Sequence, residues 1–184
     1  MTANSHINYF GYSLELSTDD YHLVGEIAKV GQEVWMTAYG IFSDEWVKEW
    51  AEEINASDAY GDAAREWSEP IVLKMHADPG MGVDEESSAY LDLADGQCRD
   101  ARLASEEDMA SVPYVIAAPP EVWKNMLDGK LDIARALTRG QLKAEKGDRG
   151  KLSSNIQGSR ELLKAAQRVY ERVPAEELPE GFRS

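Results

Sequence analysis

The chain has 184 residues, of which 43% are hydrophobic and 29% are charged, a composition typical of a globular domain rather than a disordered chain. Acidic residues number 34 against 19 Lys and Arg, and the resulting net charge of −15 disfavours binding to nucleic acids or anionic membranes. We expect no integral membrane segment, because no run approaches about 18 apolar residues. The single cysteine, Cys98, excludes an intrachain disulfide and predicts a cytoplasmic protein.

Residues 1–41 are predicted to form an N-terminal extension. Residues 1–16 alternate in part between apolar and polar side chains, which favours a short strand or an ordered arm. A helix is expected from about Asp19, after two good N-cap residues. Its apolar side chains recur every three or four residues and form one stripe. This stripe could mediate self-association or bind a protein partner through Val24, Ile27, Val34 and Trp35.

Two short helices and then several strands are predicted to follow. Ser43 and Ser57 are N-caps for helices at 44–54 and from residue 58. Residues 71–76 alternate as in a half-buried strand. An Asp-Gly turn joins the strands expected at 90–93 and 98–103 into an antiparallel hairpin. A solvated loop is expected at 77–88, a polar connection at 105–110 and a fourth strand at 114–118.

The last third of the chain alternates between helices and a strand. Pro119 and Pro120 open a helix, and a helical turn follows at 133–137. A fifth strand contains Leu142 and Ala144, one long helix covers 150–173, and 174–184 is expected to be a flexible tail. This order predicts an α+β fold, in which helices cover one face of a five-stranded, antiparallel-rich sheet.

Residues typical of catalysis are present without a recognisable arrangement. The histidines His6, His22 and His76 lack the spacing of a zinc site, so neither a metal nor a cofactor is predicted. Residues 147–152 look like a phosphate-binding loop, but only two residues separate the glycines where four are needed, and the hydroxyl residue is missing. These glycines are better explained by a turn into a helix.

One cluster on the predicted hairpin could support an activity, and it contains Asp92, Cys98, Arg99 and Asp100. Pairing of charges across the strands explains the acids and the arginine, and a buried thiol explains the cysteine. Catalysis by these residues is therefore less favoured than the two noncatalytic functions described below, and no catalytic residue is assigned.

Large apolar side chains lie on short predicted helices, including Trp46, Trp50, Trp67 and Trp123. They are typical either of a packed core or of helices that enclose an apolar ligand cavity. Periodicity alone does not separate these two interpretations.

Several motifs follow one another in a fixed order along the chain. The turn Leu127-Asp128-Gly129-Lys130-Leu131-Asp132 follows the block from Tyr114 through Trp123, and Gly140-Gln141-Leu142-Lys143 comes about ten residues later. The opening Phe42–Trp46 and the hairpin around Gly96-Gln97-Cys98 precede them. With these motifs, the segment 42–173 resembles the sterol carrier protein-2 family of lipid-binding domains.

The resemblance implies a hydrophobic tunnel between the helices and the sheet. It also implies a noncatalytic function, the binding or carriage of a sterol, a fatty acid or an acyl-CoA. Alternation on strands and phase on helices predict which side chains point inward. The predicted ligand-binding residues are Leu73, Met75, Leu91, Leu93, Ile116, Trp123, Met126, Leu127, Leu131, Leu137, Leu142, Ile156 and Leu163.

An alternative function belongs to a different class. The N-terminal extension lies outside the resemblance, and its apolar stripe is suited to contact another protein. The chain could therefore be an accessory or scaffold subunit of a larger degradative enzyme complex, where it holds a hydrophobic substrate or mediates assembly.

Overall fold

A computed structural model describes residues 5–9, 12–16 and 40–183, and the chain divides into two compact units, Met1–Ala38 and Tyr39–Ser184. In the first unit, β1 (Ser5–Tyr9) and β2 (Tyr12–Leu16) pair in antiparallel fashion, in the segment where the sequence predicts a strand or an arm. The helix expected from about Asp19 lies outside the described residues. The interaction stripe of Val24, Ile27, Val34 and Trp35 therefore stays a prediction.

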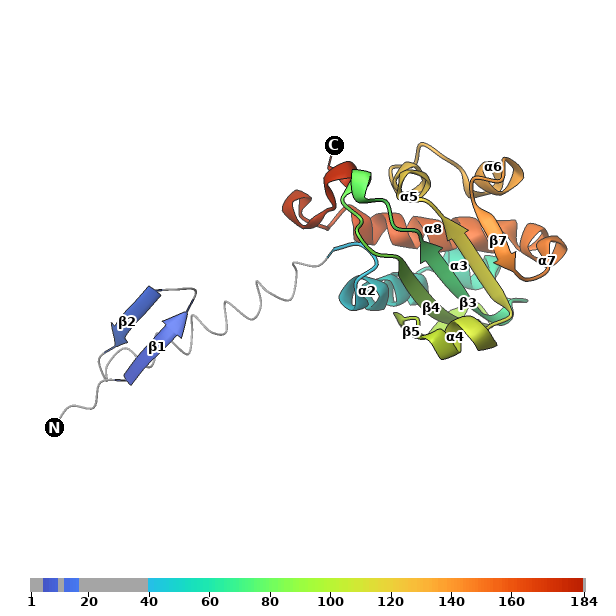
Figure 1. Cartoon of the computed structure of the whole chain (residues 1–184). Coiled ribbons are helices and arrows are strands. Elements are labelled where there is room, and N and C mark those ends of the chain that lie inside the picture. Colours follow the sequence, from blue (N-terminus) through green and yellow to red (C-terminus); the bar gives the residue numbers. More distant parts are fainter. Residues whose placement is uncertain (1–4, 10–11, 17–39, 184) are drawn as a thin grey trace. The chain divides into compact units, whose positions relative to one another are not determined.

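The second unit is built on a five-stranded sheet in the order β5-β4-β3-β6-β7 (Figure 1). The central strands β3 and β6 are parallel, and the other three pairs are antiparallel. The predicted α+β fold with an antiparallel-rich sheet is thus confirmed. The strands are β3 (Ser68–Met75), β4 (Ser87–Ala94), β5 (Gln97–Leu103), β6 (Tyr114–Ala118) and β7 (Lys143–Lys146).

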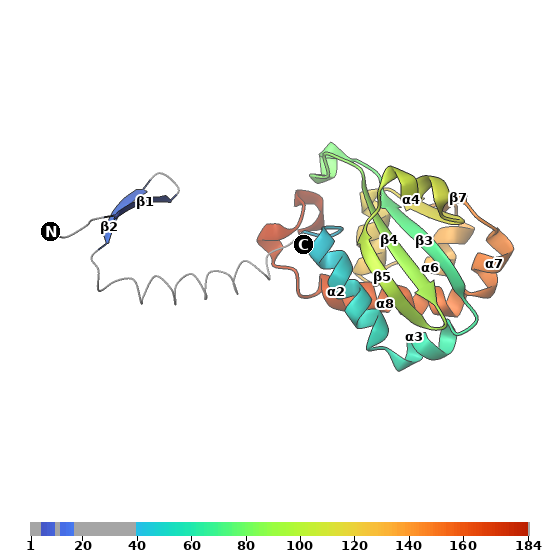
Figure 2. The same ribbon diagram turned by 90° about the horizontal axis from the view of Figure 1, so that it is seen from below.

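Helices cover most of one face of this sheet, and the long helix α8 contacts all the other helices of this layer. Each of the shorter helices α2, α3, α5, α6 and α7 packs against α8, and Figure 2 shows α2 and α8 on the side of the sheet opposite α4. In the described ranges, no helix has the length and apolar character needed to cross a membrane. The helices are α2 (Asp44–Asn55), α3 (Asp58–Ala63), α4 (Glu106–Ser111), α5 (Pro120–Leu127), α6 (Ile133–Thr138), α7 (Arg149–Ser154) and α8 (Ile156–Tyr170).

Alternation along β3 divides the core into two parts. Leu73 lies opposite Ile116 of β6, and both side chains are buried in the main cluster beneath the helices. Val72 points to the other face and packs with Val112 and Val115 in a smaller cluster that α4 helps to cover. Because the middle of β3 is buried on both faces, burial alternates only at its carboxyl end, over Leu73, Lys74 and Met75.

Three segments differ from the sequence-based expectation. The polar connection expected at 105–110 contains α4, which a reciprocal capping box of Ser105 and Asp108 begins. The long helix expected at 150–173 is divided into α7 and α8 at Asn155. Hydroxyl groups of Ser153 and Ser154 bind backbone carbonyls within α7, and such bonds compete with a continuous helix.

The end of the chain is the third difference, because the segment expected to be a flexible tail is packed. It contains two 3-10 turns, η2 (Ala175–Glu177) and η3 (Glu180–Phe182). Leu178 and Phe182 are buried in the main core. Two apolar residues in an acidic, proline-containing segment are a weak signal, yet burying each side chain contributes about 1.5–3 kcal/mol.

Candidate functional site

An apolar cavity lies between the sheet and the covering helices. The strands β3 and β6 form its floor, and side chains of α2, α5, α6, α7 and α8 form its walls. Its volume is about 40 Å³. The residues that line it are Trp50, Ile71, Leu73, Ile116, Trp123, Ile133, Leu137, Leu142, Leu152, Ser159, Leu162 and Leu163.

The structure brings together part of the predicted ligand-binding set. Leu73, Ile116, Trp123, Leu137, Leu142 and Leu163 line the cavity. The other members lie elsewhere: Leu131 is partly buried against the core, Ile156 is partly exposed, and the remaining five are buried in the core, namely Met75, Leu91, Leu93, Met126 and Leu127. Which of these residues touch a ligand stays a prediction.

Six of the twelve residues that line the cavity were not predicted from the sequence. For most of these six, the sequence contains a weak indication of an inward-facing side chain. Ile71 lies two residues before Leu73 on the same strand, so both side chains point to one face. Leu152 continues the apolar spacing of the closing helices. Trp50 is large for a short helix but equally typical of a core. Ser159 shares the helical stripe of Leu163, but a serine on a helix is usually solvated, so it was not assigned to the site. The missed residues are Trp50, Ile71, Ile133, Leu152, Ser159 and Leu162.

The polar groups in the cavity wall are already hydrogen-bonded to the protein backbone. The indole nitrogen Nε1 of Trp50 donates to the carbonyl oxygen of Leu162 at 2.9 Å, and that of Trp123 donates to the carbonyl oxygen of Lys74 at 2.9 Å. The hydroxyl of Ser159 donates to the carbonyl oxygen of Asn155 at 3.2 Å. A molecule in this cavity would therefore be held by burial of apolar surface and not by polar recognition.

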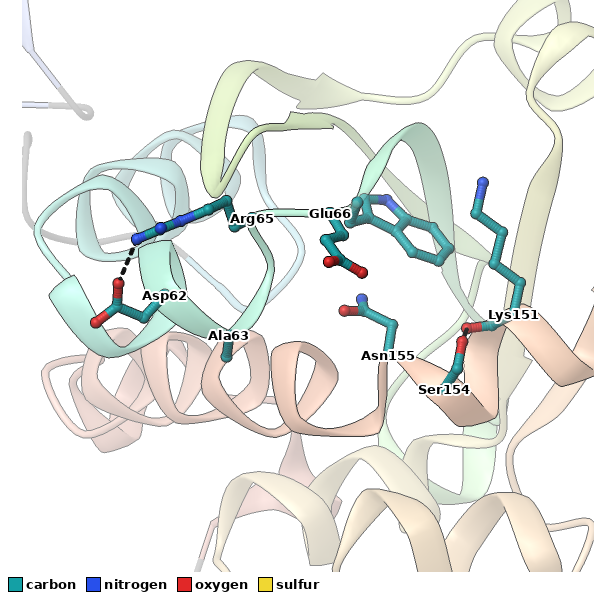
Figure 3. Close-up of a pocket in the computed structure, with 8 residues that line it drawn as sticks. Asp62, Ala63, Arg65, Glu66, Lys151, Ser154 and Asn155 are labelled. Atoms are coloured by element: carbon teal, nitrogen blue, oxygen red, sulfur yellow. Dashed lines mark hydrogen bonds and ion pairs between the residues drawn. The ribbon is translucent and has the colours of Figure 1, made fainter.

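A second, larger hollow has a different character. It lies between α3 and the junction of α7 with α8, has a volume of about 510 Å³ and is open to solvent. Figure 3 shows Arg65 bound to Asp62 at one end, with Glu66 and Asn155 facing the space between the elements. At the other end, Lys151 pairs with Glu69 at 2.9 Å. The hollow is open and polar, unlike the mostly apolar, enclosing pockets typical of small-molecule ligands.

The hairpin cluster is organised by charge pairing. Asp92 and Asp100 lie directly opposite each other in the register of β4 and β5. Arg99 binds Asp92 at 3.2 Å, and Arg102 binds Asp100 at 3.1 Å, so each acid is compensated by a cation. These four side chains are paired with one another, as the charge-pairing interpretation predicts.

The thiol of Cys98 is buried, and its burial decides its chemistry. The side chain is 5% exposed, and desolvation, with the nearby negative charges of Asp100 and Asp92, raises the pKa of this thiol to about 12. A reactive cysteine needs the opposite shift, because the thiolate is the nucleophile. Asn55 binds both backbone groups of Cys98, at 2.8 and 2.9 Å, so the residue ties α2 to β5.

Histidine does not combine with other metal ligands in the described ranges. His76 lies 3.1 Å from Glu86 and 4.0 Å from Glu145. Within residues 5–9, 12–16 and 40–183, no group of three or more His, Cys, Asp or Glu side chains is placed to hold a metal ion.

The comparison with protein families matches residues 48–158 to the SCP-2 sterol transfer family. The chain belongs to this family. Two solved structures are similar: a crystal structure of sterol carrier protein 2 is 33% identical, covers 69% of this chain and 97% of its own, and has a TM-score of 0.63. The second is the solution structure of a conserved hypothetical protein from Thermus thermophilus, described as possibly a sterol carrier protein. It is 33% identical, covers 70% of this chain and 89% of its own, and has a TM-score of 0.63. Among the curated proteins, none matches.

Membership of the SCP-2 family confirms the resemblance drawn from the Gly-Lys-Leu-Asp turn and its neighbouring motifs. The match and the described cavity fall on the same part of the chain, since residues 48–158 include most of the residues that line the cavity. Family membership supports lipid or sterol binding or transfer as the general function of this domain.

Proposed function

We propose that this protein is a noncatalytic carrier of an apolar ligand, such as a sterol, a fatty acid or an acyl-CoA. The observation that supports it is the cavity wall, which consists of apolar side chains apart from one serine and whose polar groups are already bound to the backbone. Such a wall provides hydrophobic burial at about 25 cal/mol per Å² without groups that could take part in proton or group transfer.

The size of the cavity adds a requirement to this proposal. Sites for small molecules typically have volumes of about 300–1,000 Å³, whereas this cavity measures about 40 Å³. A lipid therefore enters only if part of the wall moves. The best candidate is α6, which has six residues and whose apolar side chains Ile133 and Leu137 are only partly buried.

The first test is native mass spectrometry of the freshly purified full chain, followed by organic extraction of any bound molecule. A lipid, sterol or acyl-CoA at about one per chain would support the carrier and name its ligand class. A chain that binds nothing in this experiment, and none of a panel of these compounds in a later titration, would contradict it.

A substitution in the cavity wall provides the second test. Leu142→Phe adds volume at a buried position of the wall, and we expect the affinity for a fluorescent fatty acid to fall at least about tenfold, which corresponds to about 1.4 kcal/mol. The matched control is Leu103→Phe, the same change at an exposed position of β5. Equal affinities of the two variants would argue against this cavity as the ligand site.

The accessory-subunit hypothesis depends on the N-terminal helix, which lies outside the described residues, and it stays a prediction. The cytoplasmic location also stays a prediction.

A further inference from the structure

Positive charges on this acidic protein are distributed unevenly. Most Lys and Arg side chains between residues 40 and 183 lie within 4.0 Å of a carboxylate. The cations with no such partner among the described residues are concentrated around α6, β7 and α7. They are Arg135, Arg139, Lys143, Lys146 and Arg149, together with Arg183 near the end of the chain.

Two of these cations line a hollow at the outer side of the apolar cavity. The hollow has a volume of about 180 Å³, and Lys143 and Arg149 contribute to its wall. Leu137, Leu142 and Leu152 line both this hollow and the cavity, so these three side chains separate the two spaces. Figure 1 shows α6, β7 and α7 grouped at the β7 edge of the sheet.

The acidic residues of this region are engaged elsewhere. Glu145 pairs with Lys74 at 2.9 Å. The carboxylate of Asp148 accepts a hydrogen bond from the backbone nitrogen of Lys151 at 2.7 Å. Lys146 donates to the carbonyl oxygen of Ala110 at 2.7 Å. Lys143 and Arg149 therefore line this hollow without an ion pair to any described carboxylate.

We propose that Lys143 and Arg149 bind the anionic headgroup of a single-chain amphiphile, whose hydrocarbon chain passes between Leu137, Leu142 and Leu152 into the cavity. This inference rests on the proposed carrier function and narrows its ligand class. The cavity wall has its polar groups satisfied, so a charged headgroup has to stay outside it. Lysine and arginine bind carboxylate and phosphate strongly, and at physiological ionic strength such local charges outweigh the distant net charge, because screening acts beyond about 8 Å.

The experiment compares three twelve-carbon ligands that have different headgroups. Dodecanoate, dodecyl phosphate and dodecanol are titrated at pH 8 into the full chain and into the double variant Lys143→Met/Arg149→Gln. We expect the variant to bind the two anions about 10- to 100-fold more weakly and dodecanol with unchanged affinity, since hydrogen bonds to charged groups are the ones removed. The carboxylate and phosphate arms show which anion the hollow prefers.

The matched control removes one lysine and one arginine charge far from the proposed headgroup site. Lys48→Met/Arg99→Gln changes two exposed cations, one on α2 and one on β5, and β5 is the sheet edge opposite β7. Retained anion affinity in this control supports local recognition. Equal losses in both double variants, or an equal loss for dodecanol, would overturn it. Thermal unfolding of each variant confirms that it is folded.

Two further outcomes separate this inference from others. If the unmodified chain binds none of the three compounds and carries no lipid, the carrier function itself fails. If it binds all three and the variant differs only in binding vesicles that contain anionic lipid, the cations contact a membrane surface, and the headgroup site is overturned while the carrier function stands.

Discussion

At the scale of single residues, Trp123 belongs both to the core and to the cavity wall. Its side chain is 4% exposed, packs edge-on against Phe42 with ring centroids 5.1 Å apart and binds the carbonyl oxygen of Lys74. The residue therefore positions α5 on the sheet and forms part of the surface that would meet a ligand.

We expect Trp123→Ala to lower the free energy of unfolding by about 3–5 kcal/mol, because it removes a large buried ring and leaves a cavity. Urea denaturation followed by circular dichroism measures this change. Leu103→Ala, at a position 45% exposed, is the control and should change stability by no more than about 0.5 kcal/mol. A loss below about 1 kcal/mol for Trp123→Ala, together with a collapse of ligand affinity, would show that the residue serves the site rather than the core.

The alternation rule predicted the face of the sheet correctly but not the position of a residue along that face. Leu73 and Leu91 both point toward the helices and are both buried, yet only Leu73 lines the cavity. Leu91 lies on β4, on the side of the sheet toward β5, where α2 packs closely. Which helix covers which strand is a long-range property, and no local pattern of a single sequence contains it.

At the scale of elements, α4 depends on a polar cluster at its first turn. The carboxylate of Asp108 accepts hydrogen bonds from the backbone nitrogen and the hydroxyl of Ser105, both at 2.8 Å, and from Arg102. The hydrogen bond from Arg102, with those from Ser105, holds the pKa of Asp108 well below its ordinary value. A capping box with Asp in place of Glu or Gln explains why the sequence indicated only a polar connection.

We expect Asp108→Asn to destabilise the protein by about 1–2 kcal/mol at pH 7, the range of a lost cap with a partly exposed ion pair. Because the folded-state pKa is lowered, this stabilisation is complete above the unfolded pKa of about 3.9 and is lost as the pH falls below it. Urea denaturation between pH 2.5 and 7 should show the two proteins converging at the acidic end. Asp62→Asn, which removes an exposed pair, should have little effect, and a constant difference at every pH would contradict the linkage.

The turn between β4 and β5 has a specific backbone requirement. Asp95 and Gly96 have φ angles of 54° and 75°, as a two-residue hairpin turn needs. A Cβ atom on Gly96 would lie 2.4 Å from the carbonyl oxygen of Gly61, so the turn at Gly96 touches the backbone of α3.

We expect Gly96→Ala to cost more than about 2 kcal/mol, because the strain of the left-handed conformation, about 1–2 kcal/mol, adds to the backbone clash. Gly140→Ala is the matched control, since Gly140 has a φ of 67° and open space around its Cβ position. Thermal unfolding of both variants should give a clearly larger loss for Gly96→Ala. Equal losses would mean that α3 moves aside easily.

At the scale of the whole molecule, the packed end of the chain closes the core. Phe182 is fully buried, and its carbonyl oxygen accepts a hydrogen bond from Lys124 at 3.3 Å. We expect truncation after Val173 to lower stability by about 3–5 kcal/mol, as for the loss of a buried phenylalanine. Phe182→Ala in the full chain should reproduce most of this loss in a thermal melt. An unchanged melting temperature of the truncated chain would support the flexible tail expected from the sequence.

Because the polar groups of the cavity wall are already hydrogen-bonded, the affinity of a ligand should depend mainly on the length of its hydrocarbon chain. If hydrocarbon burial is the main attraction inside the wall, each added methylene contributes about 0.8 kcal/mol, or about a fourfold gain in affinity. In a homologous series of alkyl compounds, the affinity should then rise by a constant factor with each methylene until the alkyl chain fills the cavity that the moving wall opens. The length at which the progression stops would measure the depth of the opened cavity, and longer cargo would leave more slowly in the same proportion.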